Sequence, residues 1–159
     1  MIQFVSITAF RQALDALLKV KRGVYAGLPS EICGAFQNVP IEQIRTNRDM
    51  VLMDSESITI KLRLPDHWQH LSKADGYRLI YLVLKNSLVV AFLTVYPKRG
   101  PLQQLDIPDA ELKKLVNIFI AEARNHVVVI HDINDHLKEI ESYKTQQSRH
   151  AAQNTKIEK

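Results

Sequence analysis

The apolar pattern takes a period of two over residues 57–64 (SITIKLRL), and this alternation constrains the fold most. It predicts a strand with one buried face and one face that carries Lys61 and Arg63. Two further apolar runs follow at residues 77–84 and 88–96, and the link between them is short enough for a β-hairpin. The chain therefore predicts three successive antiparallel strands.

Helical patterns lie on both sides of these strands. A short apolar strand over residues 1–7 leads into residues 10–18, where apolar side chains recur on one helical face. Ser30 is predicted to cap a second helix that packs on the first. Asp106 is predicted to cap a closing helix with Pro108 in its first turn. These elements predict an α+β fold in which an N-terminal helical hairpin and a C-terminal helix flank a small antiparallel sheet.

Three stretches are less clearly patterned. Residues 40–50 are polar and predict a loop or a helical turn, and residues 127–130 predict a short strand or a buried turn. Residues 142–159 have almost no apolar side chains to pack, so they predict a solvent-exposed helix or a disordered tail.

Length and cysteine usage indicate one intracellular domain. A chain of 159 residues with 46% hydrophobic residues can bury a single core. Its one cysteine, Cys33, cannot form an internal disulfide and is expected to be a small buried hydrophobe. No apolar run approaches the ~20 residues of a membrane span, and no signal peptide is recognisable. We therefore expect a cytoplasmic protein without a membrane partner.

Positive charge is concentrated in the middle of the sequence. The whole chain has a net charge of +4, whereas residues 61–99 alone have +5. The charged side chains of this segment are Lys61, Arg63, Lys73, Arg78, Lys85, Lys98 and Arg99, against Asp66 and Asp75. Such a local cationic surface suits a polyanion or an acidic protein, although a solvated face without a partner has the same composition.

Pairing of neighbouring strands would gather several of these cations on one side of the sheet. Guanidinium and ammonium groups can grip a phosphodiester and stabilise the extra charge of a pentacoordinate transition state. This chemistry needs no metal or other cofactor when the 2′-hydroxyl of RNA attacks the adjacent phosphate. The cation pattern is therefore compatible with a metal-independent ribonuclease.

The order of motifs resembles the RelE/ParE superfamily of bacterial toxin–antitoxin toxins. The residues that carry the resemblance are I-K-L-R at 60–63, G-Y-R-L-I-Y at 76–81 and Y-P-K-R at 96–99, followed by the DIPDAEL segment. The resemblance covers residues 1–122 and implies a RelE-like domain whose sheet has one mixed edge. Residues 123–159 then form a C-terminal extension, helical or partly disordered, beyond the compact length of these toxins.

The resemblance implies a ribosome-dependent mRNA endonuclease. By this likeness Lys61 helps to activate the 2′-hydroxyl, Arg78 holds the transition-state phosphate and Arg99 assists the leaving 5′-oxygen. Arg63, Lys98 and Tyr96 would contact RNA. Two features depart from the pattern: Thr59 stands where a second lysine is common, and within the resemblance, which ends at residue 122, no tyrosine follows Arg99 to stack on a base.

The same likeness implies a cognate antitoxin protein as a partner, in a hetero-oligomer that binds operator DNA. Besides an autonomous nuclease that acts on free RNA, two binding functions stay open. The superfamily also contains ParE-like inhibitors of DNA gyrase, and a diverged member can bind its antitoxin without catalysis. These binding functions do not require Lys61, Arg78 and Arg99 to converge, so the geometry of that set separates them from the nuclease.

Each candidate residue also has a structural interpretation. Arg78 can stabilise the fold through a carboxylate, and Tyr77 and Tyr81 share a strand face with apolar residues, which favours a place in the core. Two polar clusters, one around Trp68 and one at residues 131–136, have no recognised ligand spacing. The sequence therefore predicts no metal site.

Overall fold

The computed structural model describes residues 1–46 and 49–142, which form one seven-stranded sheet with helices on both faces. The strands are β1 (Gln3–Ser6), β2 (Met50–Met53), β3 (Ser57–Leu64), β4 (Tyr77–Leu84), β5 (Val89–Pro97), β6 (Val129–Asp132) and β7 (Lys138–Ser142). The helices are α1 (Thr8–Leu18), α2 (Leu28–Phe36), α3 (Ile41–Arg45) and α4 (Asp109–Arg124), with a 3₁₀ turn η1 (Lys21–Gly23). The strand order is β2-β3-β4-β5-β1-β6-β7, and among the described strands only the β1–β5 pair is parallel.

The three successive antiparallel strands predicted from the sequence are confirmed as β3, β4 and β5. They pair antiparallel in sequence order, with Arg63 opposite Arg78 and Arg78 opposite Tyr96. Side chains of directly paired residues lie on the same face of a sheet. This register therefore places Arg63, Arg78 and Tyr96 in one row on one face.

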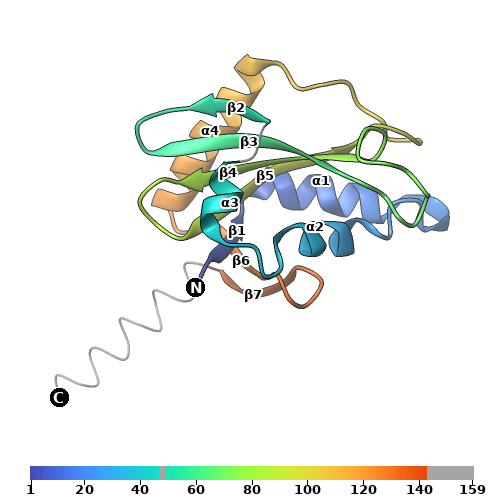
Figure 1. Cartoon of the computed structure of the whole chain (residues 1–159), viewed down its shortest axis with the longest axis horizontal. Coiled ribbons are helices and arrows are strands. Elements are labelled where there is room, and N and C mark those ends of the chain that lie inside the picture. The colour runs from blue at the N-terminus through green and yellow to red at the C-terminus, as the bar shows by residue number, and fades with distance from the viewer. Residues whose placement is uncertain (47–48, 143–159) are drawn as a thin grey trace.

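The opposite face of the sheet carries the aromatic core. Phe92 of β5 is fully buried, and its ring centroid lies 5.2 Å from that of Phe10 in α1 and 5.6 Å from that of Phe36 in α2. Tyr81 packs edge-on against Phe36. Helices α1 and α2 therefore cover this face, and α4 covers the other (Figure 1). The hairpin arrangement predicted for these two N-terminal helices is not confirmed, because the contacts that place them are with the sheet and its aromatic core.

Both predicted helix caps are wrong. Helix α2 begins at Leu28 with Gly27 at its N-cap, because Pro29 is accommodated in the first turn and Ser30 lies inside the helix. Helix α4 begins at Asp109 with Pro108 at its N-cap, and neither cap donates or accepts a side-chain hydrogen bond. The Asp106 carboxylate instead lies near Lys61 of β3 and near Lys98, which follows β5.

The sheet continues past residue 122, where the sequence placed the end of the domain. Strand β6 pairs antiparallel with β1, and β7 pairs with β6, so residues 129–142 belong to the same sheet. Within residues 40–50, the structure has the short helix α3 and the start of the edge strand β2. The prediction for residues 143–159 lies outside the described residues. Within the described part of the chain, no helix has the length and hydropathy that a membrane span requires.

A buried histidine links the added strands to β1. The Nδ1 of His131 lies 2.7 Å from the carbonyl oxygen of Leu137, which can only accept, so Nδ1 carries the proton. Nε2 is then the acceptor for the Ser6 hydroxyl at 2.6 Å, and Arg11 also donates to that hydroxyl oxygen. Burial lowers the pKa of His131 below its ordinary 6.5, outweighing the Leu137 hydrogen bond and nearby Glu139. The fold therefore holds a neutral imidazole.

This network predicts that the protein loses stability in mild acid. The unfolded chain protonates His131 below about pH 6.5 while the folded chain does not, so the free energy of unfolding falls with decreasing pH until the lower folded pKa is passed. Between the two pKa values the slope is up to about 1.4 kcal/mol per pH unit. Urea titrations at several pH values should show this slope in the parent chain and its loss in His131→Gln. A slope that persists in the variant would assign it to other groups.

Candidate nucleic-acid interface

The cationic row, which consists of Lys61, Arg63, Arg78 and Lys98, lies at one end of the sheet, beyond the cover of α4. Ser57 and Thr59 begin the same face of β3 and line a small cavity with Val116 and Asn117 of α4. Lys61 and Arg63 follow on this face by the period-two rule. Helix α4 packs over the first half of β3. The second half of the strand, with Lys61 and Arg63, is therefore not covered by this helix.

A carboxylate from outside the sheet lies among these cations. The segment between β5 and α4, drawn in gold, runs back along the sheet and includes Asp106 (Figure 1). The Asp106 Oδ1 atom lies 3.7 Å from Lys61 Nζ and 3.6 Å from Lys98 Nζ, and the Tyr96 hydroxyl donates to it at 3.4 Å. Partial burial would raise the pKa of Asp106, but Lys61 and Lys98 outweigh it and lower the pKa below its ordinary value.

Arg78 holds the loop that precedes its own strand. Its Nη1 donates to the carbonyl oxygens of Lys73 at 2.9 Å and Tyr77 at 3.2 Å, and its Nη2 donates to that of Ala74 at 2.8 Å. Only 7% of the residue is exposed. Burial lowers the pKa of the Arg78 guanidinium, and Arg63 on the neighbouring strand adds to this shift. Arg78 therefore stabilises the fold, as its structural interpretation expected, but it does so by binding backbone carbonyls instead of a carboxylate.

Replacing Arg78 by alanine is expected to lower the free energy of unfolding by about 2–4 kcal/mol, because three backbone carbonyls lose a charged donor in a buried position. Arg63→Ala is the matched control, since Arg63 lies directly opposite and is exposed. Its effect should stay within about 0.5 kcal/mol. Chemical denaturation of both variants measures the difference. Equal changes in the free energy of unfolding for the two variants would show that the hydrogen bonds of the Arg78 guanidinium do not stabilise the fold.

Arg99 lies apart from the contacts of Asp106. Its Nη2 atom forms an ion pair with Asp75 Oδ1 at 2.6 Å, and 59% of its side chain is exposed. The Tyr25 hydroxyl donates to the Arg99 carbonyl oxygen at 2.9 Å and fixes the backbone there. The three predicted catalytic residues therefore have different neighbours: Lys61 contacts Asp106, Arg78 contacts backbone carbonyls and Arg99 contacts Asp75.

Tyr96 faces the cationic row but has little free surface. Only 1% of the residue is exposed, and burial, with Asp106 nearby, raises the pKa of its hydroxyl to about 12. Its hydroxyl can donate to an anion, whereas its ring is too buried in this conformation to stack on a base. Tyr77 and Tyr81 lie on the opposite face and are buried, which confirms their expected place in the core.

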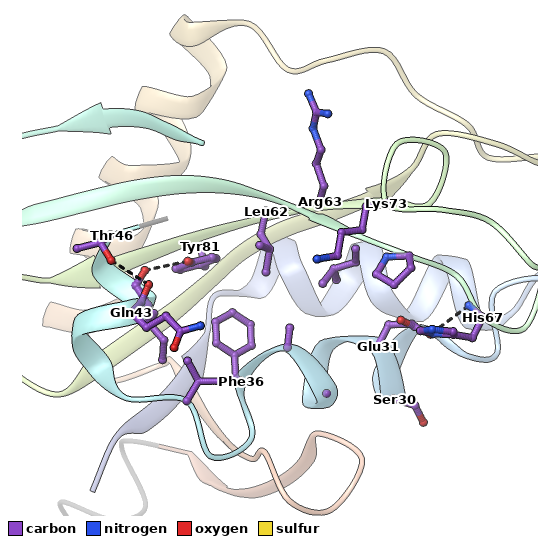
Figure 2. Close-up of a pocket in the computed structure, with 16 residues that line it drawn as sticks. Ser30, Glu31, Phe36, Gln43, Thr46, Leu62, Arg63, His67, Lys73 and Tyr81 are labelled. Atoms are coloured by element: carbon purple, nitrogen blue, oxygen red, sulfur yellow. Dashed lines mark hydrogen bonds and ion pairs between the residues drawn. The ribbon is translucent and has the colours of Figure 1, made fainter. Parts of the chain in front are cut away.

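A groove of about 750 Å³ lies on the opposite side of the sheet, between α2, α3 and β3. Figure 2 shows Lys73 directed into this groove and Arg63 extending away from it. Its polar rim includes Glu31, which accepts a 2.6 Å hydrogen bond from the His67 ring. The groove therefore lies mainly on the other face of the sheet from the cationic row, and Arg63 borders both.

The polar clusters of the sequence are accounted for by other contacts. His131 bonds to Ser6 and Leu137 inside the fold, and His67 pairs with Glu31. Across residues 1–46 and 49–142, no group of three or more histidine, cysteine, aspartate or glutamate side chains is arranged to hold a metal ion. Cys33 is buried, as expected.

Sequence reasoning missed the role of Asp106 at this face. The local pattern favoured a helix cap, and no local signal shows that the backbone returns along the sheet to bring this residue to Lys61. The only pointer was the isolated acidic residue in a neutral stretch, QQLDIP, which follows the basic segment.

No protein-family model matches the chain, and no curated protein is significantly similar to it.

Proposed function

We propose that this chain is the toxin of a toxin–antitoxin pair, a RelE-like endonuclease that cleaves messenger RNA on the ribosome. The observation that carries the proposal is the gathering of Lys61, Lys98 and the Tyr96 hydroxyl around one point on the sheet face. At that point they hold an anionic oxygen. A phosphodiester of RNA presents the same kind of oxygen, and the motif order of residues 57–99 resembles that of the superfamily.

In the proposed reaction the 2′-hydroxyl oxygen attacks the adjacent phosphorus, and the bond from phosphorus to the 5′-oxygen breaks. The products are a 2′,3′-cyclic phosphate and a free 5′-hydroxyl, so the proton lost by the 2′-oxygen is balanced by the one gained at the 5′-oxygen. Lys61 orients and activates the 2′-hydroxyl, Lys98 and Arg63 bind the phosphate, and Arg99 assists the leaving oxygen. Arg78 positions the loop before β4, and its buried positive charge helps to attract the phosphate.

The proposal includes a cognate antitoxin protein and a toxin–antitoxin complex on operator DNA. Its support is the resemblance alone. An antitoxin would neutralise the toxin by covering or rearranging the cationic row, which a mixture of the two proteins can test by loss of RNA cleavage.

A second candidate is a ParE-like gyrase inhibitor, and one observation favours it. Arg78 is engaged by carbonyls and Arg99 by Asp75, so two of the three predicted catalytic cations have other contacts. A protein that binds gyrase does not need those cations to converge on a phosphate.

Induction of the full chain in bacteria, with mapping of new RNA 5′ ends, separates the candidates. Cuts that appear only in translated messages and keep phase with the reading frame would support the endonuclease. Growth arrest without new ends, with relaxed plasmid DNA, would support the gyrase inhibitor. Unchanged growth in a strain that lacks the antitoxin would exclude both toxic activities and leave a diverged binding protein.

A further inference from the structure

The segment that connects β5 to α4 places the carboxylate of Asp106 beside the cationic row. Tyr25 fixes the start of this segment, since its hydroxyl donates to the Arg99 carbonyl and accepts from the Leu102 amide at 3.1 Å. The Gln104 amide then donates to the Pro97 carbonyl at 3.0 Å. Lys98 Nζ donates to the Gln104 carbonyl at 3.3 Å, and Ile107 packs against the core. Between these two anchors the chain is open to solvent: Leu105 is 88% exposed, and the Asp106 side chain is 62% exposed.

The contacts of Asp106 are numerous but weak. All three partners lie 3.4–3.7 Å from one carboxylate oxygen, which is longer than a strong charge-assisted hydrogen bond of roughly 2.7–2.9 Å. Exposed ion pairs of this kind contribute little to stability. The carboxylate also does not cap α4, so its departure leaves the N-terminus of that helix unchanged.

A phosphate group matches the same partners. It carries negative charge on several oxygens, so one oxygen can take the position of Asp106 Oδ1 while another reaches a second cation. Arg63 is an exposed guanidinium on the same face, suited to that second contact.

We infer that the Asp106 carboxylate is an internal substitute for a phosphate, so that an RNA phosphodiester binds at Lys61 and Lys98 only after displacing it. The identification of the ligand as RNA rests on the proposed function, whereas the anion position rests on the geometry. Asp106 thus weakens RNA binding in the free protein, because every RNA phosphate competes with a carboxylate tethered beside the site.

Asp106→Asn tests this inference because it keeps the size of the side chain and removes its charge. Binding of a single-stranded 2′-O-methyl RNA, which cannot be cleaved by 2′-attack, is measured by fluorescence anisotropy. The variant should bind roughly three- to tenfold more tightly than the parent chain. The matched control is Asp15→Asn, an exposed carboxylate on α1 at the other face, for which the change should stay below about twofold.

Three results of this measurement would overturn the inference. Unchanged affinity in Asp106→Asn would show that the carboxylate does not compete. Weaker binding would show that Asp106 assists the ligand. An equal gain in Asp15→Asn would reduce the effect to net charge.

A second probe separates failure of this inference from failure of the proposed function. The same proteins are titrated with inorganic tripolyphosphate, which has no ribose, and the thermal unfolding midpoint is followed. A larger upward shift in Asp106→Asn together with no RNA cleavage by the parent chain would keep the anion site and reject the RNA function. RNA cleavage by the parent chain, with neither ligand sensitive to Asp106→Asn, would keep the function and reject the inference. Failure of both ligands to bind any variant, together with no RNA cleavage by the parent chain, would reject both.

Discussion

Lys61→Ala is expected to reduce RNA cleavage by roughly 100-fold or more. Lys61 lies within 3.7 Å of the carboxylate oxygen that marks the anion position, and its side chain is only 27% exposed. A positioned proton-transfer group typically contributes about 10²–10⁴-fold to a reaction rate, and a charge that stabilises the transition state contributes about 10²–10³-fold. Cleavage of a translated message in a purified ribosome assay gives the rate.

Lys19→Ala is the matched control for Lys61→Ala. Lys19 is exposed at the end of α1, and its loss removes the same charge far from the cationic row. Cleavage should change less than about twofold in this control. Both variants should unfold within about 1 kcal/mol of the parent chain, because Lys61 takes part in only a weak ion pair. Cleavage that survives Lys61→Ala at the parent rate would remove this lysine from the mechanism.

Gly76→Ala is expected to lower the free energy of unfolding by more than about 2 kcal/mol. A Cβ at position 76 would clash with the Leu64 carbonyl oxygen and lie 2.9 Å from the Pro65 carbonyl carbon. These neighbours are backbone atoms at the end of β3, so relief requires the strand itself to move. The Gly76 carbonyl also accepts the Lys98 amide at 2.9 Å, so a shift there would disturb β5 as well.

Gly34→Ala provides the opposite result in the same experiment. A Cβ at Gly34 meets no atom within 4 Å, and the residue lies inside α2. Alanine there is expected to raise the free energy of unfolding by about 0.5–1 kcal/mol, because glycine loses more backbone entropy in a helix. Denaturant unfolding of both variants should therefore give changes of opposite sign. A stable Gly76→Ala protein would contradict the close approach of β3 and β4.

Local patterns in the sequence predicted the parts of the fold that carry strong periodicity. The alternation in residues 57–64 and the spacing in residues 10–18 depend only on the chain's own geometry, and both elements are present. The edge strands β2 and β7 were missed because exposed strands lack a clean pattern. Their stability comes from pairing with β3 and β6, which the local sequence does not encode.

The sequence predicted which cations belong to the candidate site better than it predicted how they are arranged. The structure brings Lys61 and Lys98 to one carboxylate, and the register places Lys61 and Arg63 on the same face. The free guanidinium expected for Arg78 is engaged by loop carbonyls, because the preceding loop folds back onto its side chain. A contact between a side chain and the backbone of a loop leaves no periodic pattern in the sequence.

The sequence by itself determined which segments form the central strands and the long helices, where positive charge accumulates and which aromatic residues lie in the core. Each of these follows from side-chain type and spacing along a single element. Only the tertiary structure decided which cations share a neighbour, that β6 joins β1, and that Asp106 lies beside Lys61 and Lys98. These are encounters between segments far apart in the chain, and their geometry depends on how the whole sheet is ordered and how α4 is connected to it.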